Sequence, residues 1–121
     1  MGAVAVFKRL SSKLLKCSDL FGSKDLPITT IAHYCPGCDE LHHFAIDKPF
    51  SNGAHWTLTG DFERPTFAPS MDVGRNTKLR CHYIVTAGRI RYLADCHHDL
   101  AGITIDMQDV PASAVEWMEP A

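Results

Sequence analysis

Apolar side chains recur at two different spacings along this chain. Near its start, Val6, Leu10 and Leu14 follow one another every four residues, with basic side chains opposite them. That spacing predicts a short amphipathic helix, followed by a connector that ends at Pro27. From Ile28 onward, apolar residues alternate with polar ones or form short runs rich in β-branched and aromatic residues, which is typical of strands.

Six segments have this strand pattern, and they are separated by turn-forming residues. They cover residues 28–34, 41–47, 55–60, 80–87, 89–94 and 103–107. We expect segment 61–75 to be irregular, because it holds two prolines, which cannot donate backbone hydrogen bonds. The predicted fold class is therefore mainly β (small α+β), an antiparallel sheet with a short N-terminal amphipathic helix.

Length and charge narrow the classes of protein to which the chain can belong. Its 121 residues carry a formal net charge of −2 and suit a single domain. Basic residues gather in the first 16 positions, and none follows Asp95. Because the body has no basic face, we expect no binding to nucleic acid. We also expect no membrane span and no signal peptide, and hence a cytoplasmic protein.

Cysteine and histidine supply most of the candidate chemistry, with five Cys and seven His. Cys35 and Cys38, in the run Cys-Pro-Gly-Cys, have the spacing of a zinc knuckle, in which two thiolates face one tetrahedral ion. A redox dithiol has the same spacing, but it normally opens a helix, whereas a strand pattern follows here. The pair therefore favours zinc over redox chemistry.

A hairpin supplies the other candidate ligands. If Gly88-Arg89 forms a type II′ turn, Cys81 lies opposite Cys96, and the two thiols complete a site with the Cys35–Cys38 pair. The sequence thus predicts a zinc-stabilised sheet whose ligands are Cys35, Cys38, Cys81 and Cys96. In an alternative, His42 or His98 replaces one cysteine as the fourth ligand.

The same register places His82 opposite Asp95. A carboxylate on one imidazole nitrogen makes the other nitrogen more basic, as a general base or a catalytic metal ligand requires. A purely structural hydrogen bond would have the same partners. Ser70 would complete a Ser-His-Asp set, although no spacing argument brings it to His82, and a turn-forming serine is the alternative. His42 and His98 could line this pocket as acid/base groups or as ligands of a second zinc.

These residues fall within an ordered set of motifs. The motifs are Cys35-Pro36-Gly37-Cys38-x3-His42, Trp56, Gly60-Asp61, Pro65-Thr66-Phe67-x-Pro69-Ser70, Cys81-His82 and Gly88-x-Ile90-x2-Leu93-x-Asp95-Cys96-x-His98-x-Leu100-Ala101-Gly102. Over residues 34–106 the chain resembles a family of small phage and prophage proteins, often mislabelled ammonia monooxygenase. Relatives of that family occur in bacterial operons for ubiquitin-like conjugation. Asp39 departs from the glycine expected after the second cysteine.

The resemblance implies a zinc-binding domain in which one set of side chains forms a site. The predicted catalytic residues are His42, Ser70, His82, Asp95 and His98. Through the operons, it also implies a peptidase that acts on a ubiquitin-like protein or its conjugates. We therefore expect a cytoplasmic Zn²⁺ protein (in the host cytoplasm if phage-encoded) that hydrolyses peptide or isopeptide bonds.

The alternative function is a non-enzymatic zinc-stabilised module that docks a host or phage protein. Both functions require a protein or peptide partner, and neither predicts an oligomeric state. In either case, the expected organisation is a basic helix and connector over residues 1–27 and a zinc-binding β domain over residues 28–121.

Overall fold

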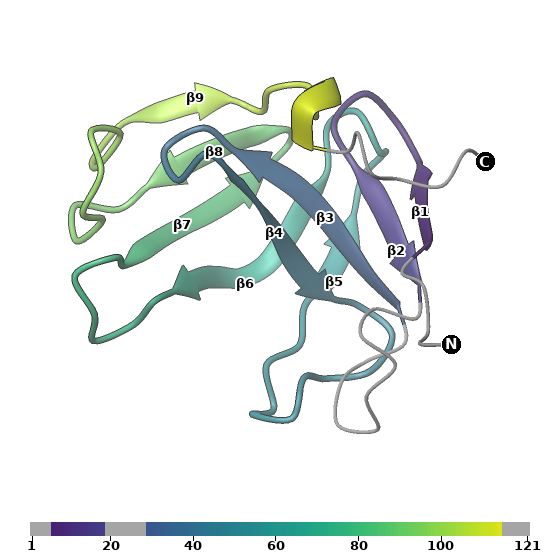
Figure 1. The fold of residues 1–121 in the computed structure, drawn as a ribbon, viewed down its shortest axis with the longest axis horizontal. Coiled ribbons are helices and arrows are strands. Elements are labelled where there is room, and N and C mark those ends of the chain that lie inside the picture. Colours follow the sequence, from purple (N-terminus) through teal and green to yellow (C-terminus); the bar gives the residue numbers. More distant parts are fainter. Residues whose placement is uncertain (1–5, 19–28, 115–121) are drawn as a thin grey trace.

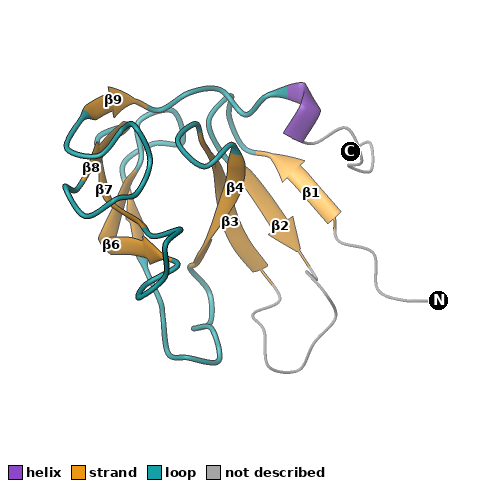
Figure 2. Cartoon of the chain, turned by 60° about the vertical axis from the view of Figure 1, so that its left-hand side comes forward, coloured by secondary structure: helices purple, strands orange, loops and turns teal. Residues whose placement is uncertain are grey.

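The computed structural model describes residues 6–18 and 29–114, which form two antiparallel sheets packed face to face (Figure 1, Figure 2). The N-terminal sheet contains β1 (Val6–Arg9), β2 (Leu15–Ser18), β3 (Thr29–Cys35) and β4 (Glu40–Ala45). The C-terminal sheet contains β5 (Thr57–Thr59), β6 (Thr66–Val73), β7 (Cys81–Thr86), β8 (Arg89–Tyr92) and β9 (Thr104–Asp106), and the 3-10 turn η1 (Ala112–Ala114) follows. The mainly β prediction is confirmed. In the described ranges, no helix has the length and apolar character needed to cross a membrane.

The predicted N-terminal helix is wrong, because its residues form the hairpin β1–β2. Phe7 pairs with Cys17 across the hairpin, both side chains are buried, and burial along β2 alternates with a period of two. In the turn, the hydroxyl of Ser11 accepts hydrogen bonds from the backbone N–H groups of Lys13 and Leu14, at 3.1 and 3.2 Å. Such local bonds compete with the backbone bonds of a helix. β2 pairs with β3, and most of the predicted connector lies outside the described residues.

The proline-rich segment 61–75 is irregular only at its ends, because Thr66–Val73 within it forms β6. β5 pairs only with Thr66–Ala68, and the register against β7 shifts between Phe67 and Met71. Pro69 lies in this bulge on an open strand edge, where a missing N–H breaks no ladder bond. Ser70 is the last residue of this bulge, directly before Met71, where regular pairing with β7 resumes.

Aromatic side chains from both sheets fill the space between the layers. Phe44 of β4 stacks on Phe67 of β6, with 3.9 Å between ring centroids, and Trp56 meets Phe44 edge-on at 5.4 Å. Tyr83 and Tyr92 are almost fully buried beside them. Aromatic pairs of this kind add to the stabilisation from burial, and they fix how the two sheets lie on each other.

The turn between β7 and β8 differs from the predicted one. Thr86 pairs with Arg89, so the loop residues are Ala87 and Gly88, with φ angles of 49° and 77°. Two positive φ angles are typical of a type I′ turn, not of the predicted type II′ turn. The pairing of β7 with β8 is therefore shifted by two residues from the expected register. Because side chains alternate with a period of two, every residue keeps its expected face.

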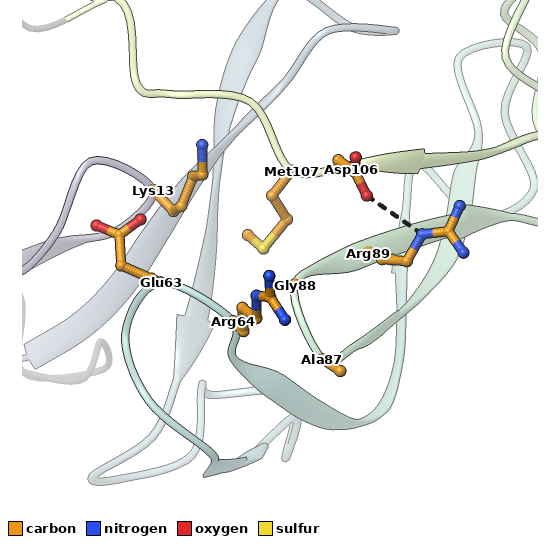
Figure 3. Close-up of a pocket in the computed structure, with 8 residues that line it drawn as sticks. All are labelled: Lys13, Glu63, Arg64, Ala87, Gly88, Arg89, Asp106 and Met107. Carbon is orange, nitrogen blue, oxygen red and sulfur yellow. Dashed lines mark ion pairs between the residues drawn. The ribbon is translucent and has the colours of Figure 1, made fainter.

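The same turn borders a hollow of about 440 Å³ at the far end of β7 from Cys81 (Figure 3). The side chains around it include the exposed ion pair of Arg89 and Asp106. Gly88 packs directly against Arg64, since a Cβ added at Gly88 would lie 2.9 Å from the Cα of Arg64. Both its conformation and its surroundings therefore require glycine at position 88.

The type I′ turn predicts how substitutions at its two loop residues change the stability of the protein. Gly88→Ala should lower the free energy of unfolding by about 1–2 kcal/mol, because a Cβ is costly at positive φ. Ala87→Gly should raise it by up to about 1 kcal/mol, because it removes that cost at the neighbouring position. Urea unfolding of both variants measures the two changes, and an Ala87→Gly variant less stable than the parent would contradict the turn type.

Candidate functional site

Three polar side chains meet on the outer face of the C-terminal sheet. The Oγ atom of Ser70 lies 3.1 Å from Nε2 of His82, and Nδ1 of His82 lies 3.2 Å from a carboxylate oxygen of Asp95. The hydroxyl donates to Nε2, and the Nδ1–H group donates to the carboxylate. This is the hydrogen-bond order of a Ser-His-Asp triad, in which a serine, its base and the group that orients the base are linked in series.

Backbone pairing brings the triad together from three segments. Asp72 lies opposite His82 in the β6–β7 ladder, so Ser70 is one diagonal step away on the same face. After β8, the backbone N–H of Leu93 donates to the carbonyl of His82 at 2.9 Å. This bond holds the following loop against β7, and Asp95 in that loop reaches the imidazole without being its ladder partner.

Arg80 orients the carboxylate end of the triad. Its guanidinium binds both carboxylate oxygens of Asp72, at 3.0 and 2.9 Å, and also contacts Asp95 at 3.2 Å. The hydrogen bond from His82, together with the charge of Arg80, lowers the pKa of Asp95. Asp95 is therefore an anion held by two donors. No sequence pattern assigns Arg80 a role, because its cross-strand pair with Asp72 follows only once β6 is known to be a strand.

Trp56 supports the serine from the other side. Its indole N–H donates to the backbone carbonyl of Ser70 at 3.2 Å, and the ring is 7% exposed against Phe44. A groove of about 400 Å³ begins at this contact and is lined by Ser70, Trp56 and Phe50 among others. The triad hydroxyl therefore lies at the edge of a cavity that is large enough for amino-acid side chains.

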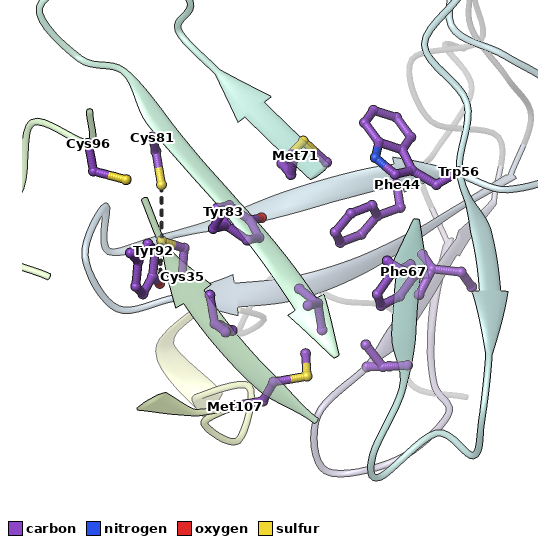
Figure 4. Packing of buried hydrophobic residues seen from close by; sticks show 14 of the residues in the cluster. Cys35, Phe44, Trp56, Phe67, Met71, Cys81, Tyr83, Tyr92, Cys96 and Met107 are labelled. Carbon is purple, nitrogen blue, oxygen red and sulfur yellow. Dashed lines mark hydrogen bonds between the residues drawn. The ribbon is translucent and has the colours of Figure 1, made fainter. Parts of the chain in front are cut away.

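A second group of side chains lies between the ends of the two sheets. The ligand atoms of Cys35, Cys38, Cys81 and His98 all lie within 4.8 Å of one another. Cys35 ends β3 and Cys81 begins β7, and their sulfurs face each other across the two layers (Figure 4). Cys38 comes from the turn after β3, and His98 from the loop that also carries Asp95.

The distances and charges in this group are compatible with a metal ion. The sulfurs of Cys35 and Cys81 are 3.9 Å apart, close to the ~3.8 Å that tetrahedral coordination at 2.3 Å gives. Nε2 of His98 lies 3.2 Å from the sulfur of Cys81. A hydrogen bond from Cys81 lowers the pKa of Cys35 to about 5, while burial and this neighbouring thiolate raise the pKa of Cys38 to about 12. A bound cation would offset the repulsion between neighbouring thiolates, and the remaining thiols would then lose their protons.

The group contains His98 where a fourth cysteine was predicted. The sulfur of Cys96 is turned to the backbone of His82, accepting from its N–H at 3.1 Å and donating to its carbonyl at 3.0 Å. Gly37 allows the imidazole to approach, since a Cβ there would lie 2.4 Å from the ring of His98. The structure therefore favours the alternative in which a histidine completes the set.

His42 lies apart from the triad, between the sheets. Its Nδ1 is 2.9 Å from the hydroxyl of Tyr83, whose other neighbour is Nε2 of His33 at 2.5 Å. Burial lowers the pKa of His33 to about 3, so this imidazole is neutral. His42 also forms a three-residue group with Cys38 and Glu40 that could hold a metal. The five predicted catalytic residues thus divide in two: Ser70, His82 and Asp95 meet, whereas His42 and His98 lie on the side of the cysteines.

Comparison with known proteins gives one match. The model of the family described as bacterial ubiquitination-like system serine protease (BubE) matches residues 8–93. The match includes Ser70 and His82 and ends two residues before Asp95, and it begins at β1, earlier than the resemblance in the sequence motifs. Neither the curated proteins nor the solved structures contain a match to the chain. Because the matched region covers well over half of the sequence, the chain belongs to the BubE family.

Proposed function

We propose that the protein is a serine hydrolase that cleaves a peptide or isopeptide bond in a ubiquitin-like protein or its conjugates. The observation that carries this proposal is the hydrogen-bonded series Ser70–His82–Asp95. The description of the family as serine proteases of a ubiquitination-like system supports both the nucleophile and the class of substrate. The groove beside Ser70 supplies space for the substrate.

In the first half of the reaction, Oγ of Ser70 attacks the carbonyl carbon of the substrate and its proton passes to Nε2 of His82. Asp95 accepts the Nδ1–H bond and stabilises the imidazolium that forms. The tetrahedral intermediate then collapses, the carbon–nitrogen bond breaks, and His82 gives its proton to the departing amine. The acyl group is left as an ester on Ser70.

The second half of the reaction uses the same groups. Water gives a proton to Nε2 of His82 and attacks the ester, and the proton returns to Oγ of Ser70 as the acyl group leaves as a carboxylic acid. Arg80 keeps the Asp95 carboxylate in place in both halves, because the Arg80 guanidinium is itself held by Asp72. The net reaction is hydrolysis of one amide bond.

We further propose that the cysteine and histidine group binds zinc as a structural ion. Three thiolates and one imidazole are a common zinc set, and four protein ligands leave no open position for a catalytic water. The ion would cross-link the two sheets beside Cys81, whose neighbour in sequence is His82. Thiolates that bind a metal ion are typical of a reducing compartment, which supports a cytoplasmic location.

Replacing the proposed nucleophile tests the enzyme function. Ser70→Ala should abolish labelling by a fluorophosphonate and lower amide hydrolysis by roughly 10⁴-fold or more, as should His82→Ala. Ser113→Ala, at an exposed serine in η1, is the matched control and should behave like the parent. Labelling of Ser70 followed by mass spectrometry is the measurement. A parent protein that is folded and zinc-loaded but never labelled would contradict the hydrolase and favour a binding module.

Two variants distinguish the ligand sets. Loss of a residue that only supports a metal ligand weakens metal binding by roughly 10–100-fold. His98→Ala should weaken zinc binding by more than this, because it removes a ligand. Cys96→Ala should keep one zinc per chain, because the thiol of Cys96 bonds to backbone groups of His82. Metal analysis combined with competition by a chromogenic chelator measures both effects. Loss of zinc from Cys96→Ala, with zinc kept by His98→Ala, would favour the four-cysteine set instead.

A further inference from the structure

The groove beside Ser70 follows a strand edge that has no strand partner in the part of the chain that the structure describes. β5 pairs only with Thr66–Ala68, so among the described strands the later part of β6 has β7 as its neighbour (Figure 1). The groove borders this part of β6 as well. Residues 69–73 of β6 line the groove without interruption. The proposed nucleophile is therefore on an edge strand, where another extended chain could pair.

Hydrogen bonds around His82 show which backbone groups of β6 face this groove. The N–H of His82 donates to the sulfur of Cys96, and its carbonyl accepts from Leu93, so both groups point away from β6. In an antiparallel ladder, the backbone N–H and carbonyl groups of two directly opposed residues either bond to each other or all point away from the partner strand. Asp72, opposite His82, therefore directs its own N–H and carbonyl into the groove, where they have no hydrogen-bond partner among the described residues.

The groove is apolar next to this edge. Phe50 meets Trp56 edge-on, with 6.1 Å between ring centroids, and both rings line the groove together with Met71. Asp72 is the one carboxylate among the lining residues, and Arg80 binds both of its oxygens. The groove therefore offers a backbone donor and acceptor beside these apolar side chains, with His43, Asn52 and His55 elsewhere in its lining. This combination fits an extended peptide with an apolar side chain.

We propose that the substrate of the hydrolase binds as an added strand on the open edge of β6. This inference rests on the proposed function. The added strand runs antiparallel, as do all the strand pairs described in this sheet. The substrate residue whose carbonyl is attacked then lies beside Ser70, whose own backbone carbonyl already accepts from Trp56. The residue two before it exchanges backbone hydrogen bonds with Asp72. The residue between them faces the same side as Met71 and places an apolar side chain between Phe50 and Trp56.

Strand addition limits the class of substrate. The segment before the cleaved bond must be extended and free of its own strand partners, as in a flexible tail, because both backbone groups of one residue bond to Asp72. A folded surface loop could not supply them. The residue immediately before the attacked one is apolar and uncharged.

The test uses N-acetyl tripeptide coumarin amides of the form acetyl-Ala-Xaa-Yaa, in which Xaa and Yaa are varied. Hydrolysis rates are divided by the concentration of Ser70 that a fluorophosphonate labels, and each peptide is also assayed for protecting Ser70 from that label. Large apolar Xaa should exceed Ala by about 10- to 100-fold in kcat/KM. N-methylation of the alanine amide, which bonds to Asp72, should cost about tenfold, whereas N-methylation of the Xaa amide should cost much less.

Matched variants complete the experiment. Phe50→Ala should reduce the preference for apolar Xaa, whereas Phe62→Ala, at an aromatic residue that is 44% exposed and outside the groove, should leave it unchanged. Equal rates or equal protection for the two N-methylated peptides, or no protection by any peptide, would overturn strand addition while labelling of Ser70 still supports a hydrolase. Absence of labelling would instead overturn the proposed function itself.

Discussion

At one end of the sandwich, the sulfur of Cys35 from the N-terminal sheet meets the sulfur of Cys81 from the C-terminal sheet. Stacked aromatic rings hold the middle of the two layers together, but this contact holds the end that carries the chemistry. Cys81 is followed directly by His82, and His98 joins the same group from the loop that supplies Asp95. A cation bound there would therefore fix the two segments that carry the base and its carboxylate. Because a chain of this length has a small core, one such cross-link would contribute a large part of the stability of these two segments.

Much of the sheet structure could be predicted from the alternation of apolar residues, whereas two segments could not. The N-terminal helix was predicted from a four-residue spacing in which Leu14 belongs to a turn, and the hydrogen bonds of Ser11 within that turn are a local event that periodicity does not record. β6 was not predicted because its proline argues against a central strand. Pro69 lies instead in a bulge on an open edge, and sequence alone does not distinguish an edge strand from a central one. The first error thus concerns a local hydrogen-bonded turn, and the second concerns the place of a strand within its sheet.

Of the predicted site residues, Ser70, His82 and Asp95 come together, whereas His42 and His98 lie on the side of the cysteines. The contact of His82 with Asp95 follows from the turn and loop that end the β7–β8 hairpin, not from the ladder register used to predict it. Ser70 could not be placed beside His82 until β6 was known to be a strand. The choice between Cys96 and His98 depends on a single backbone contact that turns one thiol away, and ligand spacing gives no information about such a contact.

The central claim is that an ion bound by Cys35, Cys38, Cys81 and His98 would hold the triad in its hydrogen-bonded order. Proton NMR of the zinc-loaded and zinc-stripped protein tests it most directly, through the low-field resonance of the Nδ1–H group of His82 that donates to Asp95. The resonance should be present with zinc, disappear after chelation, and return when zinc is restored. A resonance that persists unchanged in metal-free protein would show that the triad is assembled without the ion.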